Sequence, residues 1–227
     1  MKTAVIELLF PRFCLGCGYV GEYICGGCEK GMKKIKKTAC FYCGRPSLFG
    51  LTHPRCKKTK GIDGHLSLYT YDGLFKKLLQ ETKYKGAHLI MNTLLSFPQQ
   101  PLFHDLNKWN NLFDPLVVSV PLHPQRIRER GFNQVDIITK HYFSDSHFLK
   151  GTILKRTVNT EHLANMKSKN KRKKHIHDAF KFTADTVPEA VLLVDDVITT
   201  GSTILECAKI VKESGVQIVL AFSLAKG

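Results

Sequence analysis

The first quarter of this 227-residue chain contains seven of its eight cysteines, and their spacing limits what this part can fold into. Three Cys-x-x-Cys pairs are followed by one His-x-x-Cys pair. A Cys-x-x-Cys pair can form a tight knuckle that offers two thiolates to one ion, and two knuckles complete a tetrahedral zinc shell. We therefore expect two structural Zn²⁺ sites, since neither set would leave a coordination position open. The expected ligands are Cys14, Cys17, Cys25 and Cys28 at the first site and Cys40, Cys43, His53 and Cys56 at the second.

The alternatives to zinc are disulfide bonds and a redox-active cysteine pair. Disulfides are characteristic of exported proteins, and the apolar stretch 4–10 is too short for a secretory signal and contains Glu7. A redox Cys-x-x-Cys normally occurs once, close to a βαβ unit. Two points stay open, because His53 can be a surface side chain and the first knuckle can pair with the third. Cys207 falls in an expected helix and is interpreted as a small buried residue.

The chain is strongly basic, with 34 Lys and Arg against 19 Asp and Glu and a net charge of +15. Residues 1–60 contain twelve basic and three acidic side chains, and residues 167–174 contain six basic ones. Such clusters favour a polyanionic partner or a phosphorylated ligand, although a basic surface also serves solubility alone. Aromatic side chains near the knuckles can stack on bases or form the core of the module. These are Tyr19, Tyr23, Phe41 and Tyr42.

Beyond the cysteines, short apolar runs alternate with amphipathic stretches. Strands are expected over 66–71, 116–120, 190–194 and 216–224, and helices over 73–83, 87–97, 132–143 and 202–214. The Pro and Asn content of residues 98–115 predicts a loop with at most one short helix. Short, almost wholly apolar strands separated by helices are typical of a parallel sheet covered on both faces. We predict a zinc-ribbon module over residues 1–62 and an α/β domain over residues 63–227.

The segment from Val191 to Thr203 has the most specific pattern in the chain. Four apolar residues lead to Asp195 and Asp196, and a loop of small hydroxyl residues around Gly201 then opens a helix. In open α/β sheets, ligands bind at the carboxyl ends of strands, where N–H groups at a helix start can hold a phosphate. Because two carboxylates would repel a phosphate, we expect them to contact sugar hydroxyls or a metal. The segment predicts a pocket for a ribose 5-phosphate group.

Further short motifs accompany this segment. They are Lys83-Tyr84-Lys85-Gly86, Ser119-Val120-Pro121-Leu122 and Arg130-Gly131-Phe132-Asn133-Gln134. With the cysteine pairs and the 195–203 loop, they resemble type I phosphoribosyltransferases and, more closely, the ComF family, over nearly the whole chain. The resemblance implies a type I phosphoribosyltransferase-like parallel sheet flanked by helices, preceded by a zinc ribbon. The family is linked to natural competence, the uptake and processing of DNA during transformation.

The resemblance also implies roles for individual residues. Asp195 and Asp196 would bind the ribose hydroxyls of phosphoribosyl pyrophosphate (PRPP) and stabilise positive charge on the sugar during transfer. The 5′-phosphate would lie on Thr199, Thr200, Gly201, Ser202 and Thr203. The pyrophosphate would lie near Leu122, His123, Arg126 and Lys83, with Mg²⁺ bridging it to the sugar. Arg128 and Arg130 are further candidates, and a cis peptide bond is expected near Leu122–His123.

Between residues 154 and 180 the sequence departs from the family pattern. Glu161 stands where we expect Gln, and Lys174-His175 where we expect Arg and Asn. These departures leave base recognition and turnover open. Two functions follow: a competence protein that binds PRPP and single-stranded DNA and can contact other competence or DNA-processing proteins, or a nucleobase phosphoribosyltransferase of salvage metabolism with no DNA role. No apolar run reaches the roughly 18–20 residues of a transmembrane helix, so we expect a soluble cytoplasmic protein.

Overall fold

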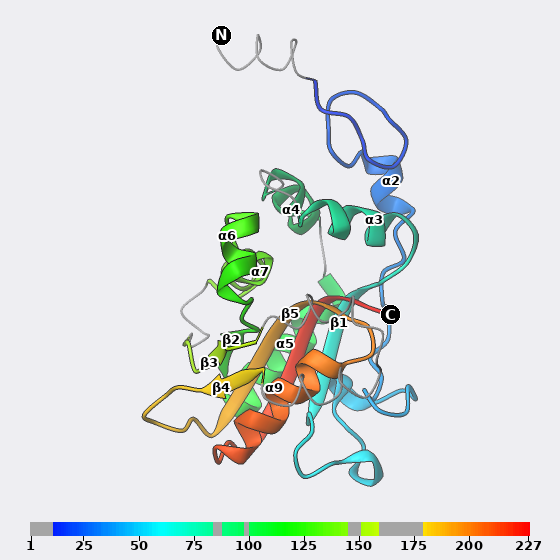
Figure 1. The fold of residues 1–227 in the computed structure, drawn as a ribbon. Coiled ribbons are helices and arrows are strands. Elements are labelled where there is room, and N and C mark those ends of the chain that lie inside the picture. The colour runs from blue at the N-terminus through cyan, green and yellow to red at the C-terminus, as the bar shows by residue number, and fades with distance from the viewer. Residues whose placement is uncertain (1–10, 84–87, 98–99, 145–150, 159–178) are drawn as a thin grey trace, which may run out of the picture.

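The structure is a computed structural model that describes residues 11–83, 88–97, 100–144, 151–158 and 179–227. Its centre is a four-stranded sheet in the order β1-β6-β5-β2, and every neighbouring pair is parallel (Figure 1). The strands are β1 (Gly64–Thr70), β2 (Leu116–Ser119), β5 (Ala190–Ile198) and β6 (Ile218–Lys226). A separate antiparallel pair joins β3 (Leu154–Arg156) to β4 (Phe180–Phe182). The predicted parallel sheet is confirmed.

The helices cover both faces of the sheet, which explains why its strands are almost wholly apolar. The described helices are α2 (Gly26–Lys30), α3 (Gly73–Glu81), α4 (His88–Leu95), α5 (Gln100–Phe113), α6 (Pro124–Arg130), α7 (Gln134–Tyr142) and α9 (Ser202–Glu213). Leu192 and Val194 of β5 face the core formed with α3, α4, α5 and α7. Val191 and Leu193 face the other way, into the core formed with α9, β3 and β4. Cys207 of α9 is fully buried there, as expected.

Helix α5 corrects the expectation of a loop over residues 98–115. The segment forms a 14-residue helix, because Leu106 and Trp109 lie three residues apart on one side of it and are both buried. Pro101 falls in the first turn, where a missing N–H removes no helical hydrogen bond. Asp114, with a φ of 40°, and Pro115 follow its end. The helix-breaking residues therefore mark the ends of this helix and not its absence.

The register of the sheet positions the candidate site. Strand β2 pairs with β5 as far as Ser119 opposite Val194. Strand β6 continues beside β5 until Lys226 lies opposite Ile198. The last residues of β5 therefore have a strand on one side only, at the carboxyl end of the sheet.

The cysteine-rich segment wraps around the outer edge of β1. The Ile35 N–H donates to the Leu68 carbonyl at 2.8 Å, and the Thr70 N–H donates to the Lys33 carbonyl at 3.0 Å. These bonds satisfy backbone groups that an edge strand otherwise leaves open. Of two 3₁₀ turns, η1 (Leu48–Gly50) lies between Cys43 and Cys56, and η2 (Pro54–Cys56) ends at Cys56 itself. The division of the chain at residue 62 stays a prediction.

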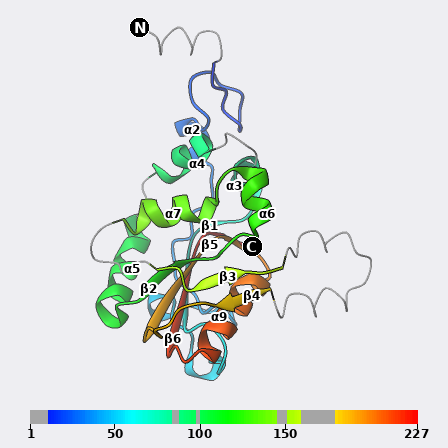
Figure 2. The ribbon, with the colours of Figure 1, turned by 60° about the vertical axis from the view of Figure 1, so that its left-hand side comes forward.

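The two views agree on the arrangement at long range. Helix α2 lies beyond α3 and α4, at the opposite end of the molecule from α9, in both orientations (Figure 2). The β3–β4 pair lies beside α9. None of the helices in the described ranges has the length and apolar character needed to cross a bilayer.

Candidate functional site

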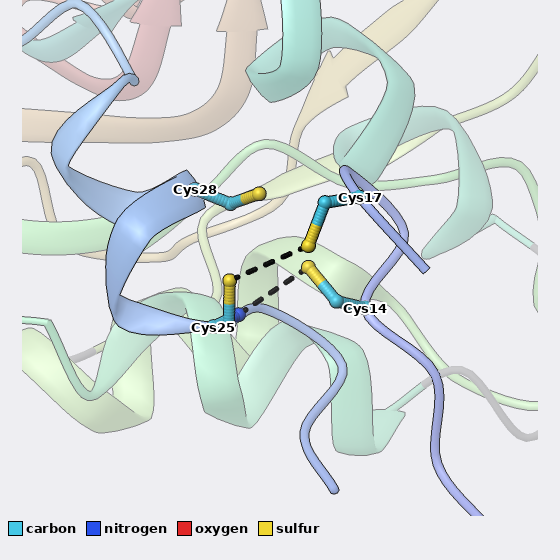
Figure 3. Close-up of side chains that lie close together, drawn as sticks. All are labelled: Cys14, Cys17, Cys25 and Cys28. Carbon is cyan, nitrogen blue, oxygen red and sulfur yellow. Dashed lines mark hydrogen bonds between the residues drawn. The ribbon is translucent and has the colours of Figure 1, made fainter. Parts of the chain in front are cut away.

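The first cysteine cluster has the dimensions of a tetrahedral zinc site. The four sulfur atoms of Cys14, Cys17, Cys25 and Cys28 lie within 4.8 Å of one another (Figure 3). The Cys17 and Cys25 sulfurs are 3.7 Å apart, close to the roughly 3.8 Å edge that Zn–S bonds of about 2.3 Å require. A Cβ on Gly16 would lie 2.6 Å from the Cys28 sulfur, so this knuckle needs glycine. Adjacent knuckles are therefore paired, and the interleaved pairing is wrong.

The second cluster brings together Cys40, Cys43, His53 and Cys56, whose ligand atoms also lie within 4.8 Å of one another. The Cys43 sulfur is 3.4 Å from His53 Nδ1. His53 Nε2 lies 3.0 Å from the Pro46 carbonyl, so it carries the proton and donates to that oxygen. This leaves Nδ1 as a lone-pair donor toward the cysteines, the orientation that metal-bound histidines adopt. His53 therefore lies in the cluster as predicted.

The surroundings of Cys43 favour its thiolate form. The backbone N–H and then the guanidinium of Arg45 lower the pKa of Cys43 to about 6. Thiolates are the form that coordinates metal. All eight cysteines belong to the described residues, and each is a free thiol. Three thiolates with one imidazole, or four thiolates, are donor sets typical of structural zinc.

A cavity of about 240 Å³ opens at the carboxyl end of the sheet. Charged side chains of both signs line it, together with residues of the Arg130–Gln134 motif. Its lining residues are Lys83, Val120, Pro121, Leu122, Arg130, Asn133, Gln134, Val135, Arg156, Asp195, Asp196, Val197, Thr199 and Thr203. A larger cavity of about 460 Å³ adjoins it and shares Pro121, Leu122 and Asn133.

The carboxylates of Asp195 and Asp196 lie on the part of β5 that extends beyond its pairing with β2. The Asp196 N–H donates to Asp195 Oδ1 at 2.9 Å, and the Val197 N–H donates to Asp196 Oδ1 at 2.7 Å. Burial, and then the charge of Asp196, raise the pKa of Asp195 well above its ordinary value. Burial also raises the pKa of Asp196, although Lys83 and Arg130 oppose this. Such a pair favours a ligand that supplies hydroxyl donors or positive charge.

The loop after β5 turns sharply into α9. Gly201 has a φ of 78° and immediately precedes the first residue of α9. No side chain caps this helix start. The Thr200 and Ser202 hydroxyls lie 2.8 Å apart, and the Ser202 N–H donates to Thr200 Oγ1 at 3.4 Å. Thr199, Thr200 and Ser202 are exposed, so the loop presents hydroxyls beside the N-terminus of a twelve-residue helix.

Three cationic side chains line the same cavity as the two acids. Arg130 ends α6 and is only 9% exposed, and its guanidinium donates to Gln134 Oε1 at 3.2 Å. Arg156 of β3 donates from Nε to the Val158 carbonyl at 3.3 Å and lies 5.3 Å above the Phe180 ring. Lys83 follows the end of α3. The cavity therefore combines two anionic and three cationic side chains.

The predicted site residues fall into three groups. Asp195, Asp196, Thr199, Thr203, Leu122 and Lys83 line the cavity, and Thr200, Gly201 and Ser202 belong to its loop. His123 is outside the lining and caps α6, where its Nδ1 accepts the Gln125 N–H at 3.3 Å. Arg126 is also outside it and pairs with Glu129 at 2.7 Å. The Lys167–Lys174 cluster, Glu161 and Lys174-His175 lie outside the described residues.

Three polar lining residues were not predicted from the sequence. Asn133 and Gln134 belong to a motif that was noted without a role, and Asn133 also caps α7 by accepting the Val135 N–H. Arg156 stands alone in β3, so no local pattern could have indicated it. The expected cis peptide near Leu122–His123 is wrong, since all described peptide bonds are trans. His123 has ordinary extended backbone angles, and Pro124 begins α6 directly after it.

Comparison with known proteins agrees with these observations. Residues 5–59 match the model of the double zinc ribbon domain. The competence protein ComFC of Streptococcus pneumoniae is 27% identical over 206 residues, which is 89% of this chain and 87% of that protein. The DNA utilization protein YhgH of Escherichia coli is 27% identical over 95% of this chain and 94% of its own length. Over most of its length the chain is therefore similar to proteins named for competence and for DNA utilization. The ComFC protein of Bacillus subtilis is 28% identical to it over 86% of this chain and 80% of the relative.

Metal analysis tests the two clusters separately. The purified protein should contain two zinc ions, and Cys17→Ser and Cys43→Ser should each retain one, because each removes a thiolate from a different cluster. The Cys207→Ala variant serves as the control, since Cys207 lies in α9 and belongs to neither cluster. Inductively coupled plasma mass spectrometry gives the count. Two zinc ions in Cys43→Ser would contradict the second site.

The raised pKa of Asp195 predicts a gain in stability on its removal. The pKa of this carboxyl group is higher in the folded than in the unfolded protein. The group therefore destabilises the fold at every pH at which it is ionised in the unfolded chain. Asp195→Asn keeps the acceptor for the Asp196 N–H and should stabilise the protein by about 1 kcal/mol at pH 7. The gain should fade toward pH 4, where the unfolded carboxyl is also protonated.

Urea denaturation at both pH values measures this effect. The control is Asp185→Asn, at an exposed position away from the cavity, which should change stability by less than about 0.5 kcal/mol. Destabilisation by Asp195→Asn at pH 7 would show that the carboxylate is held by a favourable ion pair instead.

Proposed function

We propose that the 240 Å³ cavity binds PRPP and that the protein acts in the handling of DNA during natural transformation. The observation that supports PRPP binding is that two acids, three cations and the loop at the start of α9 surround one cavity. PRPP carries vicinal sugar hydroxyls between a 5′-phosphate and a pyrophosphate. Each of these groups has a suitable counterpart on the lining.

The loop is the counterpart of the 5′-phosphate. A helix N-terminus presents unpaired N–H groups and a partial positive charge, and α9 is long enough for both to matter. Thr200 and Ser202 add hydroxyl donors beside these N–H groups. Gly201 lets the backbone turn with a positive φ from the loop into α9.

The acids are the counterpart of the sugar hydroxyls. Burial raises the pKa of both Asp195 and Asp196, because negative charge is disfavoured at this position. A phosphate group placed directly beside them would add to this charge and is therefore disfavoured. Hydroxyl donors satisfy the carboxylate oxygens without adding charge. The same oxygens suit Mg²⁺, which binds one or two carboxylates together with substrate phosphates. When bound, Mg²⁺ would neutralise charge on the pyrophosphate leaving group.

The cations are the counterpart of the pyrophosphate. Arg130 and Arg156 can each offer two parallel N–H groups to phosphate oxygens, and Lys83 adds a point charge. The buried position of Arg130 and its bond to Gln134 hold its guanidinium in place before the ligand arrives. During a transfer reaction Asp195 and Asp196 would stabilise the positive charge that develops on the sugar. The adjoining 460 Å³ cavity leaves room for an acceptor.

The proposed role in DNA handling rests on the relatives and on surface charge. The relatives are named competence proteins and a DNA utilization protein. Exposed basic side chains lie along the described part of the cysteine-rich segment, among them Lys30, Lys36, Lys37, Arg45, Arg55, Lys57, Lys58 and Lys60. Tyr19 is 67% exposed and available for stacking on a base, whereas Tyr23, Phe41 and Tyr42 pack against the core. We propose single-stranded DNA as the partner of this surface.

Calorimetric titration tests the PRPP site. The protein should bind PRPP in the presence of Mg²⁺, and Asp196→Ala should weaken binding about tenfold or more, because it removes a charged hydrogen-bonding partner. Asp185→Ala is the matched control at an exposed position outside the lining. Equal affinity in Asp196→Ala, or no binding by the unaltered protein, would contradict the proposal. Pyrophosphate release across a panel of bases then distinguishes a transferase from a PRPP sensor.

Fluorescence anisotropy with a labelled single-stranded oligonucleotide tests the DNA surface. Affinity should fall with rising NaCl, because bound phosphates release counterions. Log affinity falls with log salt, and the double variant Lys36→Glu, Lys37→Glu should make this negative slope shallower by about 1.4. Lys108→Glu, on the exposed side of α5, should bind as the unaltered protein does. Absence of binding at about 50 mM NaCl would rule out single-stranded DNA as the partner of this surface.

A further inference from the structure

Phe41 of the second cysteine cluster lies directly over the phosphate loop. A Cβ added to Gly201 would lie only 2.7 Å from Phe41 Cζ, a distance that leaves no room for a side chain. Gly201 itself is buried and has a φ of 78°. Two segments 160 residues apart in sequence are therefore in contact at the turn that begins α9. Phe41 packs in the same core as Ile198 and Ile204, which flank this loop.

The ring of Phe41 is fixed by three further side chains. Tyr42 and His65 meet it edge-on, with ring centroids at 5.1 Å and 5.5 Å. Lys226 Nζ lies 5.0 Å from the centroid on the ring face. Tyr42 is held in turn, because its hydroxyl accepts the Ile62 N–H at 3.0 Å. The ring therefore has little freedom to move away from Gly201.

The backbone of Phe41 is set by the metal knuckle. Its neighbour Cys40 is fully buried and belongs to the second cluster with Cys43. The Gly44 N–H donates to the Cys40 carbonyl, and the Cys40 N–H donates to the Arg45 carbonyl, both at 2.9 Å. These bonds close the knuckle around Phe41. The position of the ring is thus tied to the conformation of the knuckle that holds Cys40 and Cys43.

We propose that Phe41 is a positioning residue that transmits the order of the second metal cluster to the loop over residues 199–203. Glycine has the most conformational freedom of any residue, and no side chain caps α9 at Gly201. Contact with the ring restricts this freedom and holds the loop N–H groups together. The part concerning phosphate affinity rests on the proposed PRPP site, whereas the part concerning loop order does not.

The first cluster provides an internal comparison. It packs on α3, where a Cβ on Gly16 would lie 3.0 Å from Leu74, and Lys77 Nζ donates to the Leu15 carbonyl at 2.6 Å. The proposal therefore assigns control of the loop to the second cluster and not to the first. Affinity is reduced in proportion to the fraction of molecules in which the loop has its binding conformation.

Amide hydrogen exchange of residues 199–203 in the ligand-free protein is the primary test. Phe41→Ala should accelerate exchange about tenfold, the loss expected for removal of packed aromatic contacts, and Cys43→Ser should do the same. Phe41→Leu, which retains an apolar side chain, should give an intermediate rate. Cys17→Ser and Tyr19→Ala are the matched controls on the first cluster and should leave the loop unchanged. Circular dichroism verifies that each variant is folded.

Titration with PRPP and Mg²⁺ gives the second readout. Phe41→Ala should weaken binding about tenfold, and Phe41→Leu should recover part of the loss. Gly201→Ala should cost less on the Phe41→Ala background than alone, because the clash with the ring is gone. Unchanged loop exchange in folded Phe41→Ala or Phe41→Leu, or strictly additive effects with Gly201→Ala, would overturn the proposal. Altered exchange with no PRPP binding by the unaltered protein would refute only the PRPP site.

Discussion

The candidate site depends on one feature of strand pairing: at the carboxyl end of the sheet, β5 extends beyond the last residue of β2. Pairing with β2 ends at Val194, whereas pairing with β6 continues to Ile198. Asp195 and Asp196 are thus held rigidly by one neighbour and left open toward a cavity by the absence of the other. A longer β2 would place strand backbone where the ligand is proposed to lie. Helix α9 then begins close to this edge because Gly201 permits the turn.

Zinc bound at the two cysteine clusters would take the place of a hydrophobic core in the segment that precedes the sheet. A module of this size buries too little apolar surface to fold alone, and metal coordination supplies folding free energy. The segment is not an isolated appendage, however. Residues 33–35 pair with the edge of β1, and Phe41 and Tyr42 pack into the core shared with α9. The second cluster and the proposed phosphate loop therefore form one continuous structure, which explains why glycine occupies position 201 beneath an aromatic ring.

The sequence predicted the features that have a local pattern. The cysteine spacing indicated both clusters, and the apolar runs that end at Val194 and Leu224 indicated buried parallel strands. Helix α5 was missed because Pro101 and several Asn residues resemble loop composition, and the burial of Trp109 becomes evident only in the packed structure. Arg156 and the contact of Phe41 with Gly201 depend on distant segments meeting. No periodicity or motif encodes such meetings, so they require the fold itself.

Within one cavity, the acids are proposed to face the sugar and the helix start to face the phosphate. A crystal structure of the protein with PRPP and Mg²⁺ tests it most directly. We expect electron density for the 5′-phosphate against the backbone of residues 199–203 and for the ribose hydroxyls at Asp195 and Asp196. Density for the ligand outside this cavity, or a phosphate group placed against the two carboxylates without an intervening cation, would contradict it.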